Sequence, residues 1–307
     1  MKKLLIAIAL LVIIVLGGCN KTKQAETAGD VTLNKITVLA PQTPSALPLY
    51  LALKNNPLFS LDFFLNHSQA NAKFLRGDAK ILLTGISIAD SFKKQGVDFQ
   101  LISAQVDNLS HLVSNQPISS LQDIRDKTIV FPFADSPMEQ LFSAIAAKNN
   151  LTKDIDYSVT YLPLSTSLQM LQQGSDLLVW QPEPFASIAE NRYKMQVSLS
   201  LNDLYAESFP DSHPAQVVLL VRDLDIKSVA TINYLTKVYI DSLQTHPELM
   251  LKRLGADFPN SQDYTVETLR RTSYYYQDGA TLQEAINQLF QITNKENNLA
   301  DTVLELN

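Results

Sequence analysis

The chain has 307 residues, 46% of them hydrophobic and 18% charged, so it is long and apolar enough to bury one large core or two ordinary ones. Nine glycines and fourteen prolines exclude a collagen-like or low-complexity chain. The net charge of −6 argues against a nucleic-acid binder, and the single cysteine excludes a disulfide scaffold or a cysteine-based metal site.

The N-terminal segment is typical of an export signal. Lys2 and Lys3 precede an apolar run over residues 4–16, which is too short to span a bilayer but suits the hydrophobic region of a signal peptide. A Leu-Gly-Gly sequence then leads to Cys19, and this junction resembles a bacterial lipobox. We therefore expect residues 1–18 to be a signal peptide and Cys19 to carry a lipid. The alternative is an uncleaved anchor or an incidental cysteine.

Residues 19–32 are polar and predict a tether between the lipid and a folded body. No later apolar run approaches the length of a membrane span. These features predict a protein anchored to the cell membrane by its lipid and exposed outside the cytoplasm, on the periplasmic or outer face.

Short apolar runs alternate with helix-like segments from Lys35 onward, which is typical of an α/β fold with mainly parallel sheets. Strands are expected at residues 36–40, 61–65, 81–84, 99–104, 112–114, 159–162 and 216–221. The strand–loop–helix pattern at 35–56 recurs at 127–150, so we expect two lobes built on the same plan.

The C-terminal part is expected to be helical. Apolar residues at helical spacing predict packing helices over 229–243 and 282–292, the second with Thr281 as its N-cap. Tyr274, Tyr275 and Tyr276 cannot all face one way on a helix, and one of them could reach a ligand cleft.

Ligands of open α/β sheets bind at the carboxyl ends of the strands, where the helices begin. Four strand-to-helix junctions meet this condition, at residues 41–47, 85–88, 133–138 and 181–184. The candidate ligand-binding residues in these junctions are Thr43, Ser45, Ser87, Asp135, Ser136, Trp180, Gln181 and Glu183. His213, which precedes the last strong strand, is added below.

The four junctions contain hydroxyl groups and carboxylates but no lysine or arginine. This charge favours a small polar solute that is neutral or cationic and nitrogenous, and that could stack on Trp180. Structural alternatives remain open: the hydroxyl residues and Asp135 could cap their own helices or loops, Trp180 could be core, and Glu183 could only complement a helix dipole.

Motifs of catalysis are absent from the sequence, which has no Gly-x-Ser-x-Gly, His-Glu-x-x-His, P-loop or Gly-x-Gly-x-x-Gly. Four scattered histidines offer little for a metal centre. We expect no enzyme, no cofactor and no metal.

Several stretches resemble the solute-binding proteins of ABC importers of the nitrate, sulfonate and taurine type, a family that includes binders of thiamine-pyrimidine precursors. They are Pro48-Leu-Tyr-Leu-Ala, the segment 74–85 with its Leu-Arg-Gly-Asp, the segment 120–132, and Gln173-Gly-Ser-Asp-Leu-Leu-Val-Trp-Gln-Pro-Glu-Pro-Phe-Ala. The resemblance covers residues 35–225. The chain departs from the family around residues 55–60 and lacks the cysteine-rich motif of the related enzymes.

The resemblance implies a type II periplasmic-binding-protein fold, with two α/β lobes around a ligand cleft and C-terminal packing helices. On that template, lobe 1 is 33–118 plus 214–307 and lobe 2 is 119–213. His213 would then lie at the return crossover and could reach the cleft. The implied partners are a small solute, an ABC permease and its ATPase subunits, and the membrane through the Cys19 lipid, with no nucleic acid and a monomeric chain.

The leading hypothesis is thus a solute-binding lipoprotein of an ABC importer. A binder of a small anion such as sulfonate or nitrate is one alternative, and an exported enzyme on the same fold, with Glu183 close to His213, is another. A third is a sensor or docking lipoprotein whose cleft is filled by its own side chains. The sequence does not identify the solute.

Overall fold

A computed structural model describes residues 35–306, which belong to a compact unit that begins at Lys35. The predicted signal peptide 1–18, the lipidation site Cys19 and the tether 19–32 lie outside the described residues, so these remain predictions. Within the part that is described, no helix is long and apolar enough to cross a membrane.

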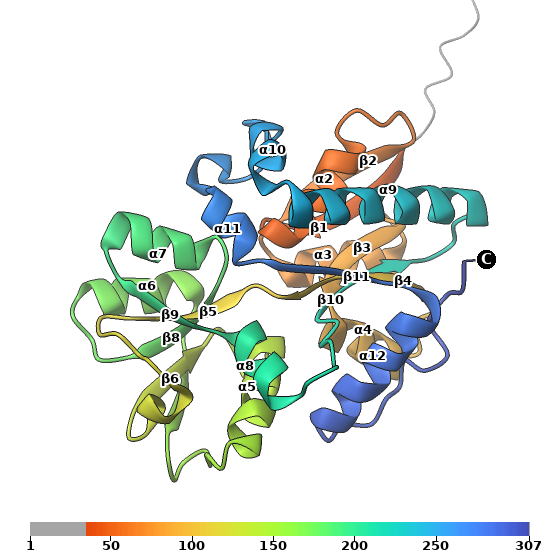
Figure 1. The fold of residues 1–307 in the computed structure, drawn as a ribbon. Coiled ribbons are helices and arrows are strands. Elements are labelled where there is room, and N and C mark those ends of the chain that lie inside the picture. The colour runs from red at the N-terminus through yellow and green to blue at the C-terminus, as the bar shows by residue number, and fades with distance from the viewer. Residues whose placement is uncertain (1–34, 307) are drawn as a thin grey trace, which may run out of the picture. The chain divides into compact units, whose positions relative to one another are not determined.

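The first sheet has six strands in the order β11-β4-β10-β3-β1-β2 (Figure 1). Strand β1 runs parallel to β2 and β3, whereas β10 is antiparallel to β3 and β4, and β11 is antiparallel to β4. The strands are β1 (Ile36–Pro41), β2 (Phe59–Phe64), β3 (Ile81–Gly85), β4 (Gln100–Asn108), β10 (Val217–Val221) and β11 (Ser273–Gln277).

The second sheet has five strands in the order β7-β6-β8-β5-β9. Strand β6 is parallel to β7 and β8, and β5 is antiparallel to β8 and β9. The strands are β5 (Ser110–Ser114), β6 (Thr128–Phe131), β7 (Ser158–Tyr161), β8 (Leu178–Pro182) and β9 (Gln196–Ser200).

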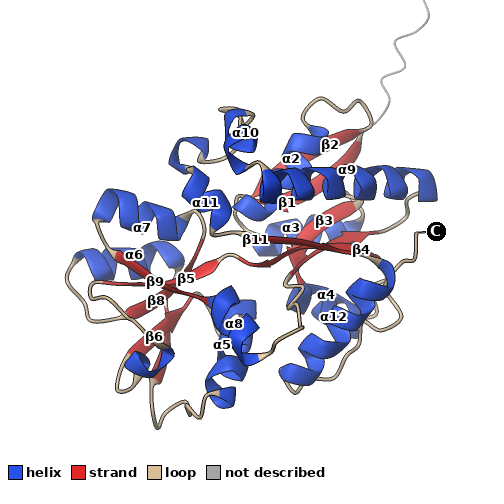
Figure 2. Ribbon diagram, viewed as in Figure 1, coloured by secondary structure: helices blue, strands red, loops and turns tan. Residues whose placement is uncertain are grey.

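Helices cover both sheets (Figure 2). Those that follow first-sheet strands are η1 (Pro44–Ala46), α2 (Leu47–Leu53), α3 (His67–Arg76), α4 (Ile86–Lys94), α9 (Ile226–Thr245), α10 (Pro247–Lys252), η3 (Ser261–Asp263), α11 (Val266–Arg270) and α12 (Gly279–Ile292). Those between second-sheet strands and after β9 are η2 (Leu121–Ile124), α5 (Pro137–Lys148), α6 (Leu164–Gln172), α7 (Phe185–Tyr193) and α8 (Leu201–Ser208).

The central strand β3 explains why the first sheet is covered on both faces. Ile81 and Leu83 point into the core cluster that contains α2 and α9 residues, and Leu82 points into the opposite cluster with α4 and α12 residues. A strand buried on both faces reads as a continuous apolar run, which is how this stretch appears in the sequence. The same packing holds the loop after β3 at the carboxyl end of the sheet's central strands.

The mixed α/β fold with two sheets and C-terminal packing helices is confirmed. Three details differ from the prediction. Tyr274, Tyr275 and Tyr276 lie in the strand β11 and not in a helix. Helix α12 begins earlier than expected, so Asp278 and not Thr281 stands at its N-cap.

The third difference concerns where the chain changes sheet. Strand β5 lies within the segment assigned to lobe 1, yet it pairs with β8 and β9 of the second sheet. The chain therefore leaves the first sheet at Leu109, before the predicted boundary at residue 118.

Candidate functional site

All four predicted junctions follow a strand and precede a helix. They join β1 to η1, β3 to α4, β6 to α5 and β8 to α7. Two junctions belong to each sheet. A site shared by both sheets requires that candidate residues from junctions of the first sheet lie close to candidate residues from junctions of the second.

One meeting point lies where the chain crosses between the sheets. The Nδ2 of Asn108, at the end of β4, donates to Oε1 of Gln216 at 2.5 Å, and the Nε2 of Gln216 donates to the carbonyl of Pro137 at 3.0 Å. Gly85 lies beside this contact, because a Cβ added there would stand 3.3 Å from Cγ of Pro137. The loop after β3 and the start of α5 are thus in close contact through uncharged groups.

Ser87 and Asp135 line one cavity of about 220 Å³, between the start of α4, the loop before α5 and α12. Asp135 has a left-handed backbone (φ 57°) and its N–H donates to Oε2 of Glu139 at 2.8 Å, while its own side chain is exposed. Ser136 instead accepts the Glu139 N–H at 3.2 Å and caps α5. Ser136 therefore caps its own helix, which was the structural alternative to ligand binding at this residue.

Thr43 and Ser45 lie in the loop after β1, with their hydroxyl oxygens 2.8 Å apart. Neither side chain caps η1 or α2. The hydroxyl of Tyr274 donates to the carbonyl of Pro44 between them at 2.9 Å, so β11 holds this loop in place.

Trp180 lies in the core and is 1% exposed. Its ring packs against Phe142 with the centroids 5.7 Å apart, so in this arrangement its face is covered by the protein itself. Gln181 beside it donates to the carbonyl of Leu164 at 3.0 Å and to Oγ of Ser167 at 2.9 Å. Trp180 therefore has no exposed ring face on which a solute could stack in this arrangement.

Glu183 is fully buried at 0% exposure, in the turn between β8 and α7. Its Oε2 accepts the N–H of Ser187 at 3.1 Å, and its Oε1 has no hydrogen-bond donor among the described residues. Burial raises the pKa of Glu183 to about 7, against the opposing influence of the Ser187 hydrogen bonds and of Arg271.

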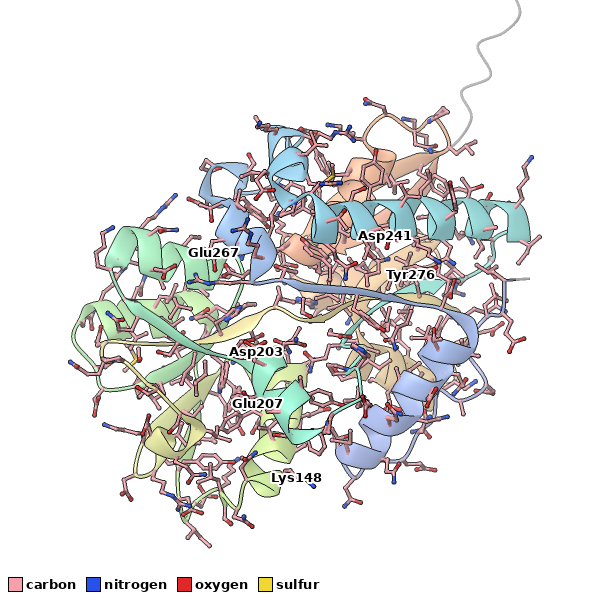
Figure 3. The ribbon with its side chains drawn as sticks, viewed as in Figure 1. Lys148, Asp203, Glu207, Asp241, Glu267 and Tyr276 are labelled. Atoms are coloured by element: carbon pink, nitrogen blue, oxygen red, sulfur yellow. The ribbon has the colours of Figure 1, made fainter. Side chains whose placement is uncertain are left out.

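Arg271, just after α11, brings a positive charge to Glu183 from the first-sheet side. Its guanidinium donates to both carboxylate oxygens of Glu190 on α7, at 2.6 and 3.0 Å, and lies 3.4 Å from Glu267 on α11. Glu267 is labelled in Figure 3. The nearest oxygen of Glu183 is 3.9 Å away. The sequence did not single out Arg271, which is 81 residues from Glu190 and lies in no strand-to-helix loop.

A buried hydroxyl contact accompanies these charges. The Oγ1 of Thr268 on α11 donates to Oγ of Ser187 on α7 at 2.9 Å. Arg192 on α7 pairs with Asp263 of η3. Helix α7 of the second sheet is therefore tied to the η3–α11 segment by two ion pairs and one hydrogen bond.

His213 does not contact the other candidates. Its Nδ1 lies 2.6 Å from Oδ2 of Asp107, which raises the pKa of His213, and its ring stacks on Tyr275 at a centroid distance of 3.6 Å. Asp107 lies at the end of β4, just before the chain leaves the first sheet. His213 thus joins the two crossover segments by non-covalent contacts, and 39% of its side chain is exposed.

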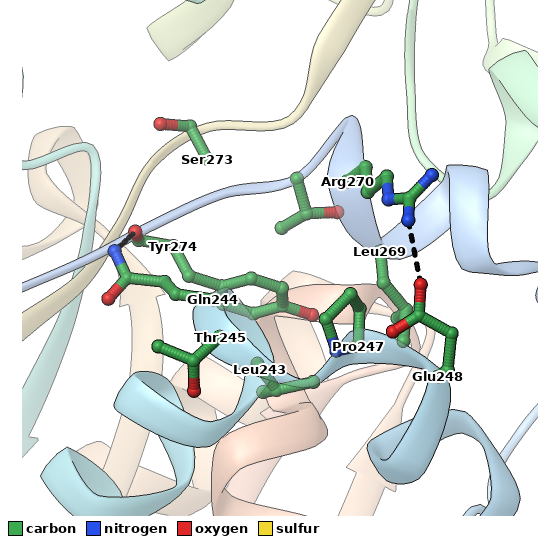
Figure 4. Close-up of a pocket in the computed structure, with 10 residues that line it drawn as sticks. Leu243, Gln244, Thr245, Pro247, Glu248, Leu269, Arg270, Ser273 and Tyr274 are labelled. Carbon is green, nitrogen blue, oxygen red and sulfur yellow. Dashed lines mark hydrogen bonds and ion pairs between the residues drawn. The ribbon is translucent and has the colours of Figure 1, made fainter.

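A larger cavity of about 490 Å³ lies away from the predicted site, between the end of α9, α10, α11 and β11 (Figure 4). Gln244 donates there to the carbonyl of Tyr274 at 2.5 Å, and Arg270 pairs with Glu248 at 2.7 Å. None of the nine candidate residues lines it. The residues that the structure describes include no group of three or more His, Cys, Asp or Glu side chains arranged to hold a metal ion.

No protein-family model matches the sequence, and no curated protein is significantly similar to it. Solved structures do share the fold. An ABC transporter protein from Parabacteroides distasonis is 16% identical, with a TM-score of 0.72, over 89% of this chain and 99% of that one. The ligand-binding component of an ABC-type import system from Staphylococcus aureus, solved with zinc bound, is 15% identical, with a TM-score of 0.66, over 88% and 98%.

The periplasmic aliphatic sulphonate-binding protein of Escherichia coli is also similar, at 14% identity and a TM-score of 0.64, over 88% of this chain and 92% of that one. At such identities the likeness shows a common fold, the bilobal fold of periplasmic binding proteins. It leaves the ligand to be argued from the residues of this chain.

Proposed function

We propose that this chain is an extracytoplasmic solute-binding lipoprotein of an ABC importer. It captures a small polar solute, neutral or cationic and nitrogenous, by closure of its two lobes. Its partners are that solute, an ABC permease with its ATPase, and the membrane through a lipid on Cys19. The protein acts as a monomer without cofactor and without catalysis.

Glu183 carries the proposal. A buried carboxyl oxygen without a donor is costly, so its presence between two α/β units favours a ligand that supplies an N–H or O–H group. The turn that holds Glu183 follows a second-sheet strand, and its neighbour Arg271 comes from the first-sheet side. This is the position in which a solute would be held by both lobes at once.

Closure around a solute requires that the solute bind the closed arrangement better than the open one. The contacts from Arg271 to Glu190 and from Gln216 to Pro137 join elements of the two sheets and would be lost on opening. These contacts stabilise a closed arrangement of the two lobes, and a bound solute would stabilise it further.

A small anion is less favoured by these residues. Arg271 is the cation nearest to Glu183 in the contacts described above, and its guanidinium is already held by Glu190 and Glu267. The four junctions contribute no lysine or arginine that could replace it. An anion would therefore meet Glu183 without a free counter-charge.

The test is a thermal-shift screen of the full chain, purified in detergent, against pyrimidines, amides, amines, amino acids, sulfonates and nitrate. A ligand at a hundred times its Kd adds about 2.7 kcal/mol to the free energy of unfolding, which moves the melting curve visibly. We expect a nitrogenous hit that is lost in Glu183→Gln and kept in the control Glu207→Gln, at an exposed position of α8.

A sulfonate or nitrate hit would keep the solute-binding function and remove the nitrogenous class. No shift with any compound would count against solute binding and favour a docking role.

A further inference from the structure

The chain crosses from the first sheet to the second between β4 and β5, and it returns over residues 209–216, between α8 and β10. On this return crossover, two neighbouring residues are held from opposite sides. The hydroxyl oxygens of Ser212 and of Tyr205 on α8 lie 2.7 Å apart. Nδ1 of His213 lies 2.6 Å from Oδ2 of Asp107 at the end of β4. The change from second-sheet to first-sheet contacts therefore occurs at the peptide bond between Ser212 and His213.

The backbone that follows His213 has an uncommon conformation. Ala215 has a left-handed φ of 42° although it carries a Cβ, and it is fully buried. Such a conformation persists only where the surroundings impose it. The next residue, Gln216, bonds to Asn108 at 2.5 Å and to the carbonyl of Pro137 at 3.0 Å. The contact of Gln216 with the start of α5 thus depends on how residues 213–215 are held.

Asp107 depends on His213 for its counter-charge. Asp107 is 2% exposed, and its Oδ1 has no hydrogen-bond partner among the described residues. In the described part of the chain, no other side chain forms an ion pair with Asp107. A buried carboxylate that loses its partner's charge is strongly destabilising. The neutral imidazole of His213 could still donate from Nδ1, but it would no longer offset the charge of Asp107.

The other titratable groups around the pair do not replace this charge. The ring of His213 stacks on Tyr275 of β11, with the centroids 3.6 Å and the planes 7° apart, and an aromatic face favours a cation. Burial raises the pKa of Tyr205 to about 12, against its hydrogen bond to Ser212 and with a further rise from the charge of Asp107, so this phenol stays neutral. Asp211 precedes on the same crossover and is exposed, so solvent screens its charge.

We propose that His213 and Asp107 form a proton-dependent ion pair that holds the return crossover. While His213 is charged, the pair fixes residues 213–215 and keeps Gln216 on the carbonyl of Pro137. When His213 gives its proton to water, the buried carboxylate of Asp107 favours an arrangement that lets water reach it, and the contact of Gln216 with α5 weakens. This inference rests on the proposed solute-binding function, in which it makes closure of the lobes depend on the pH outside the cytoplasm.

The direction of the pH dependence follows from both partners. The hydrogen bond from His213 to Asp107, with the charge of Asp107, raises the pKa of His213 above 6.5. The stabilisation by His213 is therefore present below pH 6.5 and is lost as the pH rises through the raised value. Burial raises the pKa of Asp107 above 3.8, against the hydrogen bond and charge of His213. In acid, a protonated Asp107 can still accept the bond from Nδ1 and leaves no buried charge, so the contact weakens on the alkaline side alone.

Amide hydrogen exchange of the full chain in detergent, followed by NMR, tests the ion pair without a solute. The N–H of Ile86 at the start of α4 donates to the carbonyl of Gln216 at 2.9 Å, so its protection reports whether Gln216 stays in place. Protection is corrected for the intrinsic exchange rate at each pH. Because Glu183 also titrates near pH 7, the deciding quantity is the difference between wild type and His213→Gln, which share Glu183.

Between about pH 6 and pH 9, the protection of Ile86 should fall at least about tenfold more in wild type than in His213→Gln. His246→Gln is the matched control, because His246 is an exposed histidine at the end of α9, and it should keep the wild-type fall. Asp107→Asn keeps an oxygen that can accept from His213 but removes the buried charge. It should show the small fall of His213→Gln, and it protects the test against a folding defect in that variant.

The inference is overturned if wild type and His213→Gln lose protection equally, if Asp107→Asn keeps the wild-type fall, or if His246→Gln loses it. Failure of the ion pair differs from failure of the proposed function. Equal exchange profiles would remove the pH dependence and leave any solute found in the thermal-shift screen in place. A screen without any hit would remove the solute-binding function and leave the exchange profiles unchanged.

Discussion

Two of the contacts between the parts of the chain that carry the two sheets have opposite character. On the α7 side, Arg271 and Arg192 of opposite sheets pair with Glu190 and Asp263 around the buried Glu183. On the α5 side, the contact is between uncharged groups, with Gln216 bonded to Pro137. The first contact depends on charge and therefore on pH and salt, whereas the second depends on close packing.

This difference suggests a division of tasks. Uncharged hydrogen bonds and tight packing fix how the sheets approach one another, since they tolerate little displacement. Under the proposed function, the charged groups around the buried carboxyl of Glu183 would respond to a solute bound there. Variants on each side should therefore behave differently.

The largest expected effect is on the pH dependence of stability through Glu183. Its pKa is raised from 4.5 to about 7 in the folded chain, so the folded state binds more protons than the unfolded state between these values. The stabilisation is present below about pH 4.5 and is lost as the pH rises through about 7. Urea unfolding of wild type and Glu183→Gln should show a difference that falls by about 3 kcal/mol across this range.

Glu190→Gln is the control for this measurement. The pKa of Glu190 is lowered, chiefly by its hydrogen bond to Arg271, so its contribution is present at neutral pH and lost as the pH falls through that lowered value. Because Glu190 is partly exposed, the effect should be smaller and of opposite sign. Parallel curves for wild type and Glu183→Gln would contradict the assignment.

The uncharged contact should give the next largest effect. Gln216→Leu leaves the Asn108 amide and the Pro137 carbonyl without their partner, which should lower the free energy of unfolding by about 2 kcal/mol at any pH. The loss should also be independent of salt. Gln283→Leu on α12, a less buried position, should change stability by less than about 0.5 kcal/mol, and an equal loss in both variants would argue against a special contact at Gln216.

The smallest effect is expected from Arg192→Gln. Arg192 is about half exposed and its pair with Asp263 is screened by solvent, so the loss should be below about 1 kcal/mol and should shrink further in high salt. Chemical unfolding in urea at low and high sodium chloride checks this. If Arg192→Gln lowers the free energy of unfolding equally in low and high salt, the contribution of Arg192 comes from packing and not from charge.

The strands and their following loops could be predicted because they depend on local patterns. The apolar run at β3 and the serine–proline start of α5 carry their own signals, and both form as expected. Strand β11 could not be predicted in the same way. Tyr274 and its neighbours form a strand only because β4 offers an edge for pairing.

The candidate site was predictable in part. Glu183 was found because it lies in the turn between a buried strand and the helix that follows it. Trp180 was placed at the site for the same reason, but β8 is buried on both faces, so periodicity could not tell which face Trp180 used. Arg271 is brought to Glu183 by tertiary packing, which leaves no local pattern in the sequence.

The ring of His213 has a mechanical consequence. It touches Asp107 on the outgoing chain and Tyr275 on β11, and it belongs itself to the returning chain. Three segments of the chain that are far apart in the sequence are thus held together at one point. Sliding one crossover past the other would have to break the stack or the bond to Asp107, so His213 resists that movement.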